Sequence, residues 1–127
     1  MKAFDGDRIR RAIDEAERGT SGRIGVRVVA GKTADALEDA RKHFLHARLH
    51  EHAHRNAVVF FVAPKARRFA VVGDDAIHDR VGDAFWQQLV AEMQPYFARG
   101  EMTQGLVHGI ERVGAKLREH FSAQVLA

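Results

Sequence analysis

The sequence predicts a compact α/β sandwich, in which a mixed central β-sheet carries helices on both faces. Residues 23–30 alternate in side-chain direction, with apolar residues on one face, which indicates a half-buried strand. The run AVVFFVA at 57–63 is apolar throughout, as in a strand buried on both faces. Segments with helical periodicity precede, separate and follow these strands. We expect three clear strands and room for a short fourth one.

Length and composition limit the classes of protein to consider. The chain has 127 residues, of which 46% are hydrophobic, so we expect one folded domain over 1–127. The absence of cysteine excludes disulfides, thiolate zinc sites and a cysteine nucleophile. No apolar run approaches the ~18 residues of a membrane span, and none follows the first charges as in a signal peptide. We therefore expect a cytoplasmic protein without a membrane span.

The charge balance does not favour a nucleic-acid partner. The formal net charge is +3 with histidine neutral, and the basic residues are spread along the chain. A nucleic-acid interface needs basic residues gathered on one face or in a recognised module. We expect an ion or a protein as partner instead.

The first half of the chain predicts a helix, a strand and a second helix. The helix over 5–17 begins at Asp5 or Asp7, either of which caps a first turn. The strand over 23–30 turns from half-buried at its start to more buried at its end. The second helix runs from 33 to about 50. Its expected apolar stripe is Leu37, Ala40, Phe44 and Ala47.

Two strands form the centre of the prediction. The buried strand 57–63 is followed by a hairpin-length connection at 64–67 and a returning strand at 68–73. A strand–helix–strand unit places the first two strands parallel through a right-handed crossover. The returning strand is then antiparallel to the strand 57–63, which lies in the middle of the sheet. Its return should bring Arg55, before the first of these strands, close to Asp74, after the second.

Helices complete the chain. A short helix over 76–81 should break near Gly82, and a longer one follows over 83–98. Pro95 either kinks that helix or ends it early. The last helix covers 102–121, with apolar residues at Leu106, Ile110, Val113, Leu117 and Phe121.

An acidic segment follows the third strand and predicts a site for a hard cation. Asp74 and Asp75 leave the strand directly, and Asp79 and Asp83 follow at short spacing. Carboxylates at a strand end suit Ca²⁺ or Mg²⁺, which prefer oxygen ligands. In the alternative interpretation these aspartates cap the helices that begin there.

Histidines on the second helix give another candidate site. His43, His46, His50 and His54 are spaced by three, four and four residues, so on one helix they share a face. Such a stripe suits a transition metal or a proton-sensitive surface. The alternative is a set of exposed polar side chains.

A catalytic residue is not evident, and the catalytic group stays unknown. Ser21 and Ser122 are the serines, and neither lies in a nucleophile-elbow context. Phosphate-binding glycine motifs are absent. Basic residues at the hairpin tip and at Arg55 suit an anion such as phosphate.

Three segments resemble the TPM domain, in particular its short members that stand alone without a membrane anchor. The segments are AIDEAERGTSGRIGVRVV, RNAVVFFVAPKARRFAVVGDDAIHDRVGDAFWQQL and FARGEMTQGLVHGIERVGAKL. The resemblance spans roughly residues 9 to 121. It implies a mixed sheet with helices on both faces.

The resemblance also bears on function. Some TPM members are described as acid phosphatases, some bind calcium, and many have no assigned activity. Many members open the buried strand with an acidic residue, then Asn or Asp, then Gly, where this chain has Arg55, Asn56 and Ala57. The oxygen ligands that remain for Ca²⁺ or Mg²⁺ are Asn56, Asp74, Asp75 and Asp79. We expect a non-catalytic module that binds an ion or a partner; the alternative is a metal-dependent acid phosphatase.

Overall fold

The structure is a computed structural model, and it describes residues 4–31 and 33–123. Within these two ranges, four helices and three strands follow in the order expected from the sequence. They are α1 (Gly6–Glu17), β1 (Arg23–Val28), α2 (Ala36–His46), β2 (Ala57–Ala63), β3 (Arg68–Gly73), α3 (Asp75–Ala98) and α4 (Met102–His120). Single turns of 3₁₀ helix lie at Leu49–Glu51 and Pro64–Ala66.

The sheet has the predicted topology. Its strand order is β1-β2-β3. β1 lies parallel to β2, with Arg23 opposite Ala57, and β3 lies antiparallel to β2, with Gly73 opposite Val58. In place of a fourth strand, the described residues contain an isolated antiparallel bridge between Thr20 and Ser122.

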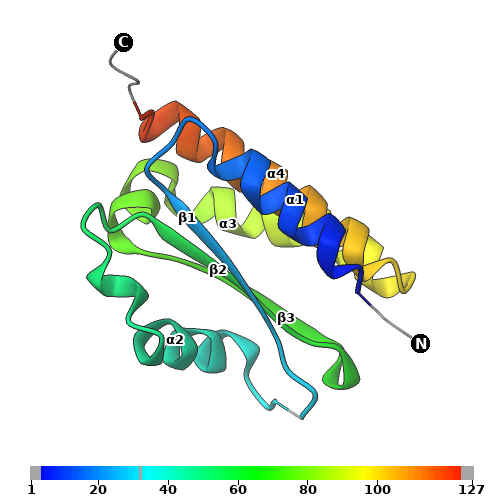
Figure 1. Cartoon of the computed structure of the whole chain (residues 1–127). Coiled ribbons are helices and arrows are strands. Elements are labelled where there is room, and N and C mark those ends of the chain that lie inside the picture. Colours follow the sequence, from blue (N-terminus) through cyan, green and yellow to red (C-terminus); the bar gives the residue numbers. More distant parts are fainter. Residues whose placement is uncertain (1–3, 32, 124–127) are drawn as a thin grey trace.

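β2 is buried on both faces, as its unbroken apolar run predicts. Val58, Phe60 and Val62 face the larger core against α1, α3 and α4. The alternate residues Ala57, Val59 and Phe61 face α2. Figure 1 shows α2 on one side of the sheet and the other three helices on the opposite side. The predicted sandwich with helices on both faces is confirmed.

The first half of the chain differs from the prediction in two details. β1 is most buried at its start, where Ile24 is 7% exposed, and Val28 near its end is 40% exposed. The predicted gradient is therefore wrong, because Ile24 and Val26 pack in the larger core whereas Val28, on the same face of β1, lies outside it. Helix α2 also buries Ala36, Ala40 and Phe44, whereas Leu37 is 42% exposed.

Helix α2 ends at His46 rather than near residue 50. Arg48 adopts a left-handed conformation with φ of 60°, which turns the chain out of the helix. The usual sequence signal for such a turn is glycine, and arginine does not give it. The end of this helix was therefore not predictable, and the helical stripe of four histidines does not form.

The break in the third helix is confirmed. Gly82 has φ of 77° and ψ of 170°, so α3 consists of two helical segments that meet there. Pro95 does not end the second segment, which continues to Ala98, and its carbonyl accepts a hydrogen bond from the Arg99 amide at 3.1 Å.

Glycines allow α4 to approach its neighbours closely. A Cβ at Gly109 would lie 2.7 Å from both the Met93 sulfur and the Phe60 ring. A Cβ at Gly114 would lie 2.7 Å from the Ala16 Cβ and 3.0 Å from its Cα. Backbone atoms cannot yield as a flexible side chain does. The two helices can therefore lie this close only because residue 114 carries a hydrogen atom in place of a Cβ.

An ion network joins α3 to α4 on the outer side of the helix pair. Glu92 accepts hydrogen bonds from His108 at 2.6 Å and from Arg112 at 2.9 Å. The Glu92 side chain is 24% exposed. These partners, His108 first, lower the pKa of Glu92 to about 2.

Within the described ranges, no helix is long and apolar enough to cross a lipid bilayer. The cytoplasmic location expected from the sequence stays a prediction.

Gly114→Ala should destabilise the protein although alanine has the higher helix propensity. We expect the free energy of unfolding to fall by about 1–2 kcal/mol, because overpacking outweighs the ~1 kcal/mol that alanine gains over glycine in a helix. Urea denaturation measures the change. Gly6→Ala is the matched control, since a Cβ at that helical position meets nothing within 4 Å. Equal stability of the two variants would show that α1 can move away at no cost.

Glu92→Gln should reduce stability at neutral pH and have little effect in acid. The folded-state pKa of Glu92 lies near 2 and the ordinary value is 4.5, so its contribution is present above about pH 4.5 and is lost as pH falls toward 2. After allowance for solvent screening we expect a difference of roughly 2 kcal/mol at pH 7. Thermal unfolding of both proteins between pH 7 and 2.5 gives the test. A constant difference across that range would contradict it.

Candidate functional site

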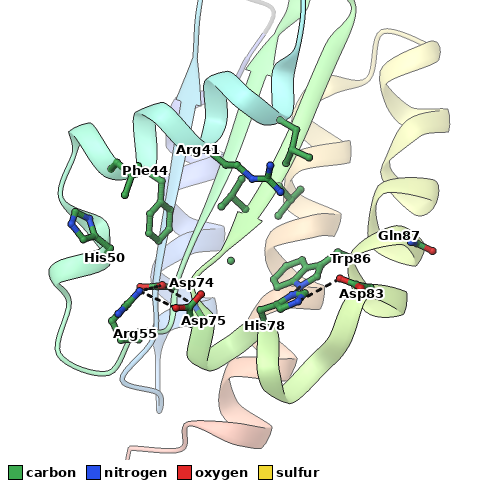
Figure 2. A pocket seen from close by; sticks show the side chains of 15 residues that line it. Arg41, Phe44, His50, Arg55, Asp74, Asp75, His78, Asp83, Trp86 and Gln87 are labelled. Carbon is green, nitrogen blue, oxygen red and sulfur yellow. Dashed lines mark hydrogen bonds and ion pairs between the residues drawn. The ribbon is translucent and has the colours of Figure 1, made fainter.

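A pocket of about 520 Å³ opens at the β3 edge of the sheet. One wall comes from α2 and includes Phe44 and Arg41, and the opposite wall comes from the first part of α3 and includes His78 and Trp86. The end of β3 lies between them. Figure 2 shows these side chains around the pocket, with Arg55, Asp74 and Asp75 gathered at one end. The predicted meeting of Arg55 with the acidic segment therefore occurs.

Strand pairing brings Arg55 and Asp74 together. Residues 55 and 74 flank the antiparallel pair of β2 and β3. The Asp74 amide donates to the Ala57 carbonyl at 2.9 Å, and the Ala76 amide donates to the Arg55 carbonyl at 3.0 Å. Arg55 itself has φ of 52°. These backbone contacts join the loop before β2 to the first turn of α3.

The guanidinium of Arg55 holds the Asp74 carboxylate with two hydrogen bonds. Nε donates to Oδ2 and an Nη donates to Oδ1, both at 2.8 Å. The Asp74 side chain is only 3% exposed, and its Oδ1 also accepts from the Asp75 amide at 2.7 Å. Such bidentate pairs combine charge with fixed geometry. The pair raises the pKa of Arg55.

The four residues predicted as metal ligands lie in different environments. Asp74 is held by Arg55 and caps α3, as the alternative interpretation expected. The Asp75 side chain is 82% exposed and lies 3.3 Å from Arg55. Asp79 is exposed and lies outside the pocket lining. Asn56 is fully buried and donates to Ser21 Oγ at 3.0 Å.

The four predicted ligands of Ca²⁺ or Mg²⁺ do not all line one pocket. Asp74 and Asp75 line it, whereas Asn56 and Asp79 do not. Among the residues that the structure describes, no three His, Cys, Asp or Glu side chains are grouped so as to hold a metal ion. The Asn56 Oδ1 atom is buried and has no hydrogen-bond partner among them. It does not line the pocket. Cation binding through Asn56, Asp74, Asp75 and Asp79 stays a prediction.

His78 is oriented across the break in α3. Trp86 Nε1 donates to His78 Nδ1 at 3.0 Å, and Asp83 lies 3.4 Å from the other ring nitrogen. An indole N–H only donates, so Nδ1 must be the acceptor and the ring proton sits on Nε2, toward Asp83. The Trp86 indole lies against Gly73, where a Cβ would come within 2.5 Å of the ring.

The four histidines proposed as a stripe separate in space. His43 and His46 lie on α2, His50 lies in the 3₁₀ turn, and His54 follows it in a loop. Burial and the positive charge of Arg27 lower the pKa of His43. The four therefore do not act as one surface that charges together.

Sequence reasoning missed Arg41, His78 and Trp86 as residues of the pocket. The expected apolar stripe of α2 does not include Arg41, and the predicted helix over 83–98 gives no reason to single out Trp86. The interval of eight residues between His78 and Trp86 crosses a non-helical glycine, so no periodic rule relates them. Arg55 and Asp74 were identified because antiparallel strands return the chain to its start.

Comparisons with known proteins agree with this architecture. The BA42 protein from the psychrophilic bacterium Bizionia argentinensis is 31% identical, with a TM-score of 0.85 over 95% of this chain and 86% of that one. The N-terminal domain of a protein from P. gingivalis is 13% identical, with a TM-score of 0.79 over 97% and 83% of the two chains. The N-terminal domain of cg2496 from Corynebacterium glutamicum is 15% identical, with a TM-score of 0.71 over 95% and 76%. At these lower identities the likeness concerns the fold alone.

The search of curated proteins found no match. The family model described as TPM domain matches residues 1–116, which include all three strands, α1 to α3 and most of α4. The resemblance drawn from the sequence is therefore confirmed, and the chain belongs to the TPM domain family.

Proposed function

We propose that this chain is a non-catalytic module that binds an ion or a protein partner at the pocket between α2 and α3. The observation that supports it most is the bidentate pair of Arg55 and Asp74. Asp74 is the buried carboxylate of this pocket, and both of its oxygens are already bound. A metal ion would have to displace a fixed cation of the protein itself.

His78 supports the same conclusion. A general base needs a free nitrogen that reaches the substrate proton. In His78 one nitrogen accepts from Trp86 and the other faces Asp83. Both serines lie outside the pocket lining. His78 and the serines are therefore engaged or lie outside the pocket. His50 also lines the pocket, and its buried Nδ1 has no hydrogen-bond partner among the described residues.

A metal-dependent acid phosphatase is the second candidate. It rests on the activity described for some TPM members and on one feature of this pocket. Asp75 lines the pocket and is 82% exposed, so its carboxylate is open to a metal ion. Arg41 and Arg55 supply cations for a phosphate group in the same pocket.

A phosphatase assay separates the two candidates. The protein is incubated with para-nitrophenyl phosphate at acidic and neutral pH, with Ca²⁺, Mg²⁺ or Mn²⁺. We expect no release of nitrophenol above that of Asp74→Asn and Asp75→Asn. Arg55 already binds both carboxylate oxygens of Asp74, and both ring nitrogens of His78 are engaged within the protein. Turnover that either substitution abolishes would overturn the proposal in favour of the phosphatase.

Arg55→Gln should make the protein less stable and newly responsive to divalent cations. The substitution leaves the Asp74 carboxylate buried without a counter-charge, which is costly. We expect the melting temperature to fall by several degrees and millimolar Ca²⁺ or Mg²⁺ to restore part of the loss, whereas the native protein shows no cation effect. Arg80→Gln is the control, since that exposed arginine lies outside the pocket. An equal cation effect on the native protein would show that Arg55 does not block the site.

A further inference from the structure

The pocket exposes the free edge of β3. In an antiparallel pair, the backbone N–H and C=O groups of successive residues point alternately toward the partner strand and away from it. Because Asp74 donates to Ala57 across the pair, Val71 and Gly73 occupy positions whose N–H and C=O groups point away from β2. β3 is an edge strand, and both residues line the pocket. Backbone hydrogen-bonding groups are therefore open to a ligand there.

The walls of the pocket suit side chains that alternate along a bound strand. Leu37 and Leu45 of α2 are 42% and 58% exposed, which is unusual for large apolar residues that line one pocket. Trp86 lies opposite them on α3. In a strand, successive side chains point to opposite faces, so one set would contact the leucines and the next would contact the indole.

Charges lie at separate places along this groove. The Arg41 side chain extends over the pocket from α2 (Figure 2) and has no ion-pair partner within residues 4–31 and 33–123. Asp75 lies beyond the end of β3, and Asp83 lies on the α3 wall. At the end near β3, Asp74 and Asp75 outnumber Arg55, so the groove presents a cation along one part and a net negative charge near the other. A bound strand with an acidic group near Arg41 and a basic group near Asp75 would complement these charges.

We propose that the pocket binds an extended peptide segment of a partner protein, which adds as an antiparallel strand to the free edge of β3. The backbone of the segment pairs with Val71 and Gly73, its apolar side chains contact Leu37, Leu45 and Trp86, and its carboxylate binds Arg41. Recognition by strand addition combines main-chain hydrogen bonds with side-chain pockets. This inference rests on the proposed binding function and names the class of partner.

The test uses the peptide acetyl-Lys-Val-Val-Val-Glu-amide, which carries valine on both faces of an extended strand, and the ¹⁵N-labelled protein. We expect the amide signals of Val71 and Gly73 to shift on titration, and their exchange with water to slow. Replacing the glutamate by glutamine should weaken binding roughly tenfold, the effect of one charge-assisted hydrogen bond. A peptide with a free C-terminal carboxylate in place of the glutamate shows which source of carboxylate the arginine prefers. Binding unaffected by removal of every carboxylate would overturn the proposal.

Two matched controls test the geometry. Arg41→Gln should weaken binding of the acidic peptide and leave that of the glutamine peptide unchanged, while Lys42→Gln, on the same helix but outside the pocket lining, should change neither. Peptides N-methylated at alternate residues test the strand pairing. Only the set whose N–H groups face β3 should lose binding. Equal binding of both methylated sets would exclude strand addition.

Other outcomes identify a different occupant. If amide protection of Val71 and Gly73 rises with protein concentration in the absence of peptide, a second copy of the chain covers the edge and the proposal is wrong. If the peptide has no effect but Ca²⁺ or inorganic phosphate shifts signals of the pocket residues, the peptide proposal fails and the binding function stands. Hydrolysis of a phosphate ester would reject the binding function itself.

Discussion

Burial of β2 on both faces is the constraint on which the rest of the structure depends. Each of its seven residues is buried, and burial of one large side chain such as Phe60 stabilises the fold by roughly 1.5–3 kcal/mol. A strand of this kind needs a neighbour on each edge and a helical layer on each face. β1 and β3 supply the neighbours, α2 covers one face, and α1, α3 and α4 cover the other. The close packing of α1 on α4 at Gly114 serves the same burial, because it lets the layer of three helices cover this face of β2.

The central strand also determines where the polar groups meet. Because β3 returns antiparallel to β2, the loop before β2 and the residue after β3 lie at the same end of the sheet. In this chain they supply Arg55 and Asp74, and their ion pair fixes the loop before β2 to the first turn of α3. The buried carboxylate has thereby become a structural group. A cation that bound both oxygens of Asp74 would have to displace the guanidinium of Arg55.

The same arrangement leaves one part of the sheet open. α2 crosses β2 and β3 from one side and α3 lies on the other, so the outer edge of β3 faces a groove between two helices. Edge strands expose unpaired backbone groups, and many proteins cover or charge them. Here the edge is bordered by exposed leucines, a tryptophan and an arginine, a combination more suited to a partner than to solvent. This chain thus places the ion pair of Arg55 and Asp74 next to an open groove with apolar walls.

The sequence by itself determined the element order, the parallel and antiparallel pairing and the helical layers, because these follow from apolar periodicity and from short connections. It also indicated that Arg55 and the acidic segment converge, since strand topology alone requires it. The end of α2 at a left-handed Arg48 lacked the glycine that usually marks such a turn. The exposed end of β1 depends on how far the core formed with α1, α3 and α4 extends along that strand. Tertiary structure alone decided that Asp74 pairs with Arg55, that Trp86 orients His78, and that Arg41 reaches the pocket. These contacts join side chains of separate elements, or of one helix on either side of its break. No local sequence pattern encodes the side-chain geometry that such contacts need.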